Sequence, residues 1–192
     1  MAAGSDNQPK PSVVVGVCGG IAAYKAAQLV SDLVQGGAGV SVVMTKSSQQ
    51  FIGESTFAAL TGRPVATGSF QQDVWPLGPH IELAEQIDCL CVAPATADMI
   101  GKLANGIADD LLTTLYLQVS CPVLIAPAMS NQMWEKPAVQ RNLAQLDSDG
   151  VQTIGPDEGW LSCRKKGPGR MSDPAEIAQR VRAISSESAQ SK

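Results

Sequence analysis

Histidine is almost missing from this chain: His80 is the only one among 192 residues. Without a second imidazole at a metal-binding spacing, a zinc site of the usual kind is disfavoured, and we expect no metal. The chain also has no G-x-S-x-G elbow, P-loop or triad-like motif, so it does not suit hydrolysis. No G-x-G-x-x-G follows its first apolar run, so the dinucleotide fingerprint is absent as well.

Long apolar runs and an excess of positive charge are also missing. No stretch is long enough to cross a bilayer, and residues 1–11 are polar, without the apolar core of a signal peptide. A net charge of −4 and a pI near 4.9 argue against a nucleic-acid partner. We therefore expect a cytoplasmic protein without membrane or nucleic-acid contacts. One domain over residues 12–184 should lie between a disordered lead-in at 1–11 and a frayed tail at 185–192.

The cysteines number five, and three of them lie in or beside apolar runs typical of buried strands: Cys18, Cys89 and Cys91. We expect the thiols of Cys89 and Cys91 to point to opposite faces of their strand. That placement argues against a disulfide and against a metal pair. The sequence therefore indicates reduced cysteines, as in the cytoplasm.

Apolar runs alternate with amphipathic segments along the chain. Residues 12–18 are typical of a buried strand, two glycines and a helical segment follow, and residues 40–44 form the next apolar run. Such a unit indicates parallel strands joined by a right-handed crossover. Further strands are expected at 64–67, 88–93, 122–126 and 151–154, and helices at 81–87, 136–146 and 174–184 among others. This pattern predicts an α/β fold with a single Rossmann-like (flavodoxin-like) parallel sheet and helices on both faces.

The ends of the first two strands carry residues that suit a ligand, and open parallel sheets bind ligands at this edge. Gly19 and Gly20 would let the backbone approach a ligand and would expose N–H groups to an anion such as a mononucleotide phosphate. Thr45, Ser47 and Ser48 add hydroxyls at the second strand end. A plain glycine turn and a helix cap explain the same residues equally well.

Residues 127–134, with the sequence PAMSNQMW, follow the fifth apolar strand. Two methionines and a tryptophan at a strand end would offer a soft apolar surface to a planar ring. Alternatively, Ser130 or Asn131 caps a helix whose Met133 and Trp134 pack into the core. Small residues after the fourth buried strand, around Thr96, leave further space for a ligand.

Residues 155–171 are rich in glycine, lack periodicity and exceed a usual connection, so we expect a functional flap or a disordered loop. Positive charges around Cys163 would favour a reactive thiol there and could receive an acidic substrate. They are Arg164, Lys165 and Lys166, with Arg170 close in sequence. A solvated basic loop with an incidental cysteine is the alternative. His80 begins a short helix, where a surface or capping role is more common, but imidazole best matches proton transfer near neutral pH.

Six motifs, in order and at compatible spacings over residues 13–184, resemble the flavin-dependent cysteine decarboxylases. Within that family the similarity is greatest to the branch that acts in coenzyme A biosynthesis, the phosphopantothenoylcysteine decarboxylases. The motifs are GGIAAYK at 19–25, HIELA at 80–84, APATAD at 93–98, GIADDLLT at 106–113, PAMSNQMW at 127–134, and Cys163 followed by GPGRM at 167–171.

The resemblance implies a Rossmann-like flavoprotein that decarboxylates 4'-phospho-N-pantothenoylcysteine to 4'-phosphopantetheine with FMN, through thioaldehyde and ene-thiolate intermediates. It also implies a homo-oligomer, either a trimer or a dodecamer of trimers, with FMN between neighbouring subunits. The chain stops after the decarboxylase portion, so we expect a separate phosphopantothenoylcysteine synthetase upstream.

The same resemblance assigns roles to individual residues. His80 and Cys163 match the catalytic histidine and the flap cysteine. Substrate contacts fall on Ser130, Asn131 and Met133. The implied FMN-binding residues are Gly20, Ile21, Ala22, Thr45, Lys46, Ser47, Thr96, Ala97, Asp98, Met99 and Ala128.

One residue departs from the family pattern, which reads P-x-M-N-x-x-M-W with an asparagine on the substrate carboxylate. Here that position is Ser130, which offers one donor in place of two. Three outcomes are open. Ser130 alone binds the carboxylate, or Asn131 takes over that contact. In the third, the enzyme stops at the ene-thiol, like the relatives that oxidatively decarboxylate the C-terminal cysteines of peptides. Those relatives lack the flap cysteine, so the presence of Cys163 favours the complete reaction, in which the ene-thiol is reduced to the aminothiol. A non-catalytic regulatory flavoprotein is a further alternative.

Overall fold

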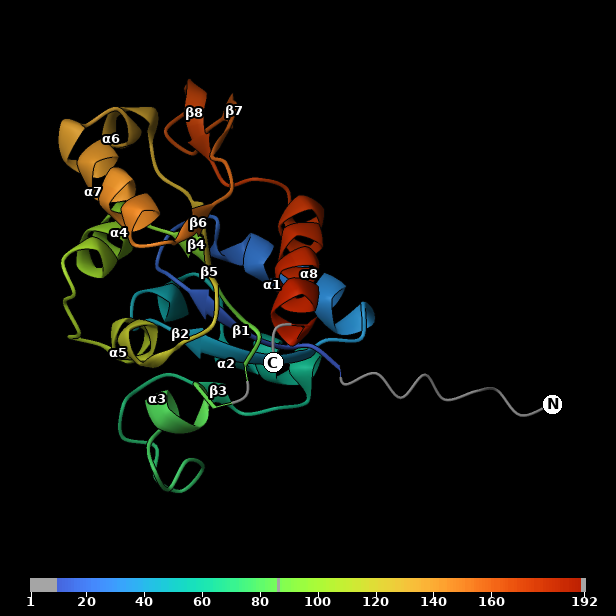
Figure 1. Ribbon diagram of the computed structural model, residues 1–192. Coiled ribbons are helices and arrows are strands. Elements are labelled where there is room, and N and C mark those ends of the chain that lie inside the picture. The colour runs from blue at the N-terminus through green and yellow to red at the C-terminus, as the bar shows by residue number, and fades with distance from the viewer. Residues whose placement is uncertain (1–9, 86, 191–192) are drawn as a thin grey trace.

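A six-stranded parallel sheet forms the centre of the protein (Figure 1). The computed structural model describes residues 10–85 and 87–190. The strand order is β3-β2-β1-β4-β5-β6. This is the Rossmann order, which confirms the predicted α/β fold; the flavodoxin order would place β3 beside β1. The winding reverses between β1 and β4, so a ligand is expected at the carboxyl ends of these strands.

The elements follow the predicted alternation of strands and helices. The sheet strands are β1 (Ser12–Val17), β2 (Gly39–Met44), β3 (Val65–Ala66), β4 (Cys89–Ala95), β5 (Val123–Pro127) and β6 (Gln152–Thr153), and β7 (Asp157–Trp160) and β8 (Lys166–Arg170) form a separate hairpin. The helices are α1 (Ala23–Gln35), α2 (Glu54–Thr61), α3 (Pro79–Glu82), α4 (Ala97–Ala104), α5 (Leu111–Gln118), α6 (Asn131–Trp134), α7 (Pro137–Ser148) and α8 (Pro174–Gln190), with a 3₁₀ turn at Ser48–Gln50.

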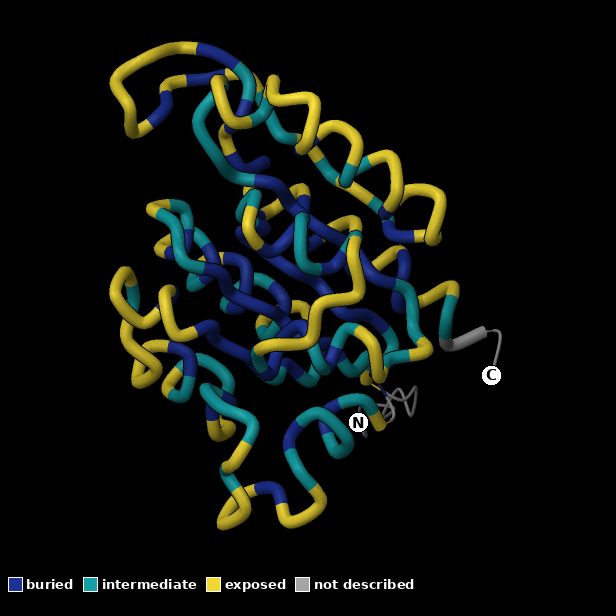
Figure 2. Tube along the Cα trace, turned by 90° about the vertical axis from the view of Figure 1, so that its left-hand side faces the viewer, coloured by how far each residue is buried: buried dark blue, intermediate teal, exposed yellow. Residues whose placement is uncertain are grey.

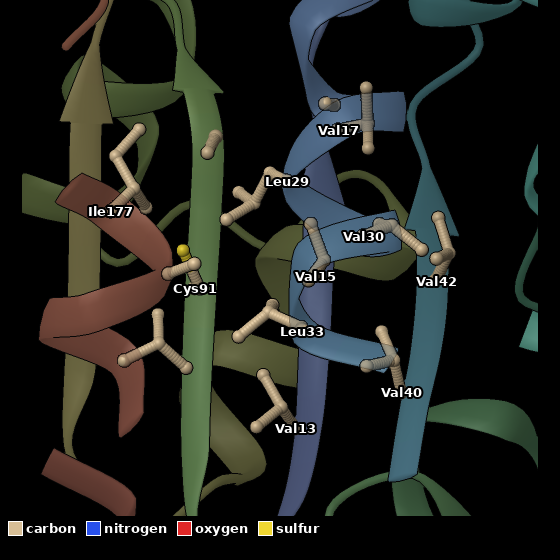
Figure 3. Close-up of a cluster of buried hydrophobic side chains, with 14 of the residues drawn as sticks. Val13, Val15, Val17, Leu29, Val30, Leu33, Val40, Val42, Cys91 and Ile177 are labelled. Atoms are coloured by element: carbon tan, nitrogen blue, oxygen red, sulfur yellow. The ribbon is translucent and has the colours of Figure 1, made fainter. Parts of the chain in front are cut away.

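Helices cover both faces of the sheet because its central strands bury side chains on both sides. Val13 and Val15 of β1 pack with Leu29 of α1 and Ile177 of α8 on one face (Figure 3). The alternate residues of β1 and β4, such as Val14, belong to a second cluster with residues of α4, α5 and α7. Figure 2 shows this layering, with buried strands inside and exposed residues on the outer turns.

The prediction for Cys89 and Cys91 was wrong. Residues two apart in a strand share a face, and both cysteines lie in the cluster of α1 and α8, whereas Leu90 lies in the other. Burial raises the pKa of the Cys91 thiol to about 12 and also raises that of Cys89. Both are therefore protonated at neutral pH, which leaves them poor metal ligands and nucleophiles.

The C-terminal region also differs from expectation. Residues 157–170 form the β7–β8 hairpin in place of an irregular loop, and α8 continues to Gln190 with Ser185 buried, so the frayed tail was wrong over 185–190. The helix expected at 81–87 is shorter, since α3 covers Pro79–Glu82. Pro11, in the expected lead-in, already accepts a hydrogen bond from the Gly39 N–H at 2.8 Å. Residues 1–9 and 191–192 lie outside the described residues.

Among the helices of residues 10–85 and 87–190, none has the length and apolar composition that a bilayer crossing requires.

Candidate functional site

Two cavities lie along the edge of the sheet where a ligand was expected. The first, the strand-end cavity, measures about 550 Å³ and is lined by residues that follow β1, β2 and β4, with parts of α4 and the loop before α5. The second, the hairpin cavity, measures about 460 Å³ and lies between the start of α1, the loop after β5 and the β7–β8 hairpin. Both volumes fall in the range of small-molecule sites.

The predicted cofactor residues are shared between these two cavities. Ile21, Ala22 and Ala128 line the hairpin cavity. Gly20 and Ala97 line neither cavity, but each lies between sequence neighbours that do. The structure therefore gathers the set at one edge of the sheet. The remaining members line the strand-end cavity: Thr45, Lys46, Ser47, Thr96, Asp98 and Met99.

The turn after β1 needs glycine at position 19 because Ser47 lies against it. A Cβ on Gly19 would overlap the Cβ and Oγ of Ser47. Thr45 holds this wall in place: its hydroxyl lies 3.2 Å from Ser47 Oγ and accepts the Ser48 N–H at 3.2 Å. Exposed backbone beside two hydroxyls is an arrangement that suits phosphate or sugar oxygens.

Thr96 begins α4 at the other wall of the strand-end cavity, and its Oγ1 accepts the Met99 N–H at 3.3 Å. One turn further, Lys102 forms ion pairs with Asp98 at 3.2 Å and Asp109 at 3.1 Å. Burial disfavours the charge on Lys102, but the bonds to Asp109 and Asp98 outweigh it and raise its pKa. Lys102 therefore stays charged and pairs with two carboxylates of this cavity, so that it neutralises one of their two negative charges.

Cys18 lines the strand-end cavity at the end of β1, and burial raises its pKa to about 12. It is therefore a neutral thiol near pH 7. Within the part of the chain that the structure describes, no three His, Cys, Asp or Glu side chains gather where they could hold a metal ion.

The predicted flap is a folded hairpin docked on the loop after β5. The Met129 N–H donates to the Gly169 carbonyl at 2.9 Å. Gly169 has a φ of 125°, and a Cβ there would overlap the Met129 carbonyl oxygen, so this contact requires glycine. In Figure 1 the hairpin stands beside α6, beyond the edge of the sheet. Apolar alternation did not reveal it because β8 reads Lys-Gly-Pro-Gly-Arg.

Cys163 lies in the turn between β7 and β8 and is exposed. The Leu161 N–H donates to the Lys165 carbonyl at 2.8 Å, and the Arg164 N–H donates to the Leu161 carbonyl at 2.9 Å. Leu161 and Ser162 line the hairpin cavity, whereas Cys163 does not. The thiol therefore stands one residue beyond the edge of that cavity.

The three predicted substrate residues have different surroundings. Ser130 lines the hairpin cavity, and its side chain makes no capping bond at the start of α6. Asn131 lies under β8, because a Cβ on Gly167 would come within 3.3 Å of its Cβ, and its buried Oδ1 has no hydrogen-bond partner among the described residues. Met133 is 46% exposed and lines neither cavity.

His80 is not brought to either cavity within one chain. It lies in α3, which packs on α5, and Figure 1 places α3 and the β7–β8 hairpin at opposite ends of the molecule. The imidazole is partly buried, and its Nδ1 is buried without a hydrogen-bond partner among residues 10–85 and 87–190. One chain alone therefore does not bring His80 together with Cys163 and Ser130.

Lys25 of the hairpin cavity was not assigned from the sequence, and Arg170 was named only among the cations near Cys163 that could receive an acidic substrate. Lys25 Nζ donates to the Met171 carbonyl at 3.3 Å. Burial, followed by the nearby charge of Arg170, lowers the Lys25 pKa. A usable signal existed, because Lys25 lies in the first turn of α1, directly after the glycine turn to which a ligand was assigned.

Proteins of known sequence and structure resemble this chain over most of its length. A family model described as Flavoprotein matches residues 1–186. The coenzyme A biosynthesis bifunctional protein CoaBC of Bacillus subtilis is 48% identical over 168 residues, which are 88% of this chain and 41% of that protein. The chain thus spans less than half the length of this relative.

Solved structures show the same similarity over nearly the full chain. A PPC decarboxylase mutant complexed with pantothenoylaminoethenethiol has a TM-score of 0.83 and 31% identity, covering 92% of this chain and 98% of the other. SpaF, one of the FMN-dependent cysteine decarboxylases, has a TM-score of 0.77 and 32% identity, covering 91% and 97%.

Proposed function

The chain belongs to the Flavoprotein family, and we propose that it is an FMN-dependent phosphopantothenoylcysteine decarboxylase of coenzyme A biosynthesis. One observation carries the proposal. A cavity of about 460 Å³ lies between Ser130 and a hairpin that bears Cys163, directly beside a second cavity lined with hydroxyls. The PPC decarboxylase mutant is similar to this protein over 92% of the chain. A flavin-dependent decarboxylase needs one space for its cofactor and another for its substrate, and the two cavities would supply them.

The donors of the strand-end cavity fit the phosphate and sugar chain of FMN. Thr45, Ser47 and Thr96 supply hydroxyls, and Lys46 adds a positive charge. Three carboxylates also line this cavity: Lys102 pairs with Asp98 and Asp109 and neutralises one of these two charges, and the third carboxylate accepts the Thr113 N–H in the N-cap of α5. Ile21, Ala22 and Ala128 would hold the apolar ring in the hairpin cavity. Bound FMN supplies the reversible two-electron oxidation that gives the carboxylate an electron sink.

The residues that act on the substrate lie at the hairpin cavity. Ser130 donates its hydroxyl hydrogen to the substrate carboxylate and orients it. The docked hairpin excludes water while the intermediates form. Cys163, on the turn of that hairpin, would donate the proton that, together with the hydride returned from bound FMN, converts the ene-thiol product of decarboxylation to the saturated aminothiol.

We further propose that the catalytic His80 acts in a homotrimer, alone or within a larger assembly, at the site of a neighbouring subunit. His80 lines neither cavity of its own chain, and its buried Nδ1 has no partner among the described residues. Phe70 is 92% exposed and Leu77 is 67% exposed in the segment just before α3. A neighbouring subunit in such an assembly would cover these apolar side chains, and their burial would favour association.

The substrate is the product of a phosphopantothenoylcysteine synthetase, which we propose as the upstream partner in the reaction sequence. An oxidative cysteine decarboxylase is the second candidate, because Ser130 offers a single donor and Asn131 lies under β8. Such an enzyme would release the ene-thiol.

The experiment is an anaerobic reaction of the FMN-loaded protein with phosphopantothenoylcysteine, followed by mass spectrometry. We expect the simple decarboxylation product. A product two hydrogens lighter would instead identify the oxidative enzyme. Cys163→Ser should release CO₂ and accumulate the lighter ene-thiol, whereas His80→Ala should release none. Protein that shows no flavin absorption band after FMN is supplied would contradict both enzymatic functions and favour the regulatory alternative.

A further inference from the structure

The hairpin cavity is positively charged. Among the described residues that line it, Lys25 and Arg170 are cations and none is a carboxylate. The strand-end cavity differs, because three aspartates line it together with two lysines. The anionic end of a substrate is therefore drawn to the hairpin cavity.

Arg170 is held in position by the opposite strand of its hairpin. Residue 170 pairs with Asp157, and its guanidinium lies 3.8 Å from that carboxylate. Asp157 is itself fixed by a hydrogen bond from Ser172 Oγ at 2.8 Å. The side chain of Arg170 crosses Gly159, where a Cβ would come within 2.9 Å of its Cδ and 3.0 Å of its Nε. Glycine at position 159 thus leaves the space in which the arginine lies.

We propose, on the basis of the function proposed above, that Arg170 binds the substrate's phosphate, with Lys25 as its partner and Gly159 as its positioning residue. A guanidinium presents paired donors that match phosphate oxygens. Two cations also match the charge of a phosphate dianion.

The phosphate is the better partner of these cations because its charge does not change in the reaction. The carboxylate leaves as CO₂, so cations placed on it would stabilise the reactant more than the transition state and slow the chemistry. Binding a distant phosphate stabilises both states equally. It lowers KM and leaves kcat unchanged.

The first test is Arg170→Gln in the FMN-loaded protein, assayed with phosphopantothenoylcysteine and with pantothenoylcysteine, which lacks the phosphate. We expect KM for the phosphorylated substrate to rise about 10- to 100-fold, as for a lost hydrogen bond between charged groups. The KM for pantothenoylcysteine and both kcat values should stay the same. The KM of Arg170→Lys for the phosphorylated substrate should lie between those of wild type and Arg170→Gln, because lysine keeps the charge but lacks the paired donors of a guanidinium. Arg141→Gln, on the exposed face of α7, is the matched control and should change nothing.

The second test separates positioning from charge. Gly159→Ala forces Arg170 aside, which a long flexible side chain permits without unfolding, and it should raise KM for the phosphorylated substrate several-fold. Combined with Arg170→Gln, it should add no further increase, because both changes act through one side chain. Independent, additive effects would overturn the role of Gly159.

Direct binding of 4'-phosphopantetheine decides which anion is recognised. This product keeps the phosphate and lacks the carboxylate, so Arg170→Gln should weaken its binding by the same factor as it raises KM. Unchanged product binding, or an equal loss with both substrates, would overturn the proposal. Wild-type protein that binds the product but decarboxylates neither substrate would contradict the proposed function alone.

Discussion

The hairpin is joined to the loop after β5 at one close backbone contact, which Gly169→Ala should break. Alanine at a φ of 125° carries a conformational cost of about 1–3 kcal/mol. Its Cβ would also overlap the Met129 carbonyl oxygen, which pushes the hairpin away from the loop after β5 and removes the 2.9 Å bond from Met129 N–H to Gly169 O. That bond contributes about 1 kcal/mol. Together these terms shift the docking equilibrium of the hairpin by about 2–4 kcal/mol toward the undocked state relative to wild type. The ratio of undocked to docked hairpin therefore rises by a factor of about 30 to 700.

Hydrogen exchange of the Met129 amide measures this docking directly, because its N–H is the donor in the broken bond. We expect the protection of this amide to fall by that factor in Gly169→Ala, while amides of β1 and β4 keep theirs. Gly68→Ala is the matched control, since a Cβ there would meet nothing within 4 Å. If Met129 is equally protected in both variants, this glycine does not control the docking of the hairpin.

Two further predictions concern stability. Asp110→Ala should lower the free energy of unfolding in urea by about 0.5–2 kcal/mol, because Asp110 and Thr113 form the capping box of α5. An unchanged urea midpoint relative to Asp109→Ala would contradict this. For Cys91, burial raises the thiol pKa to about 12 from 9.0, so the folded protein keeps a proton that the unfolded chain loses above pH 9, and stability falls between pH 9 and 12. The stability difference between wild type and Cys91→Ala should shrink by about 1.4 kcal/mol from pH 8 to pH 10, and a constant difference would refute it.

Local chemistry explains why the strand ends could be predicted from the sequence. An apolar run followed by glycine or hydroxyl residues marks the carboxyl end of a buried strand, and parallel strands align these ends at one edge. Thr45, Ser47 and Thr96 were placed together on this basis, and they line one cavity. The roles of individual residues in FMN and substrate binding stay predictions.

The hairpin shows where pattern reasoning fails. The segments 157–160 and 166–170 carry four glycines or prolines in nine positions, so neither apolar period is present. They form strands because they pair with each other and dock on Met129, a contact between segments far apart in sequence. The error for Cys89 and Cys91 had another origin, since the period of two already places them on one face.

The sequence by itself determined the α/β fold, the positions of its strand ends and the family resemblance, because these follow from local periodicity and short motifs. Only the tertiary structure decided which charges share a cavity. Lys25 and Arg170 lie 145 positions apart and meet because α1 and the hairpin border the same space. It also separated His80 from Cys163, since α3 follows β3 and the hairpin follows β6, which are the opposite edge strands of the sheet. Distances between elements depend on the packing of the whole core, which no local pattern encodes.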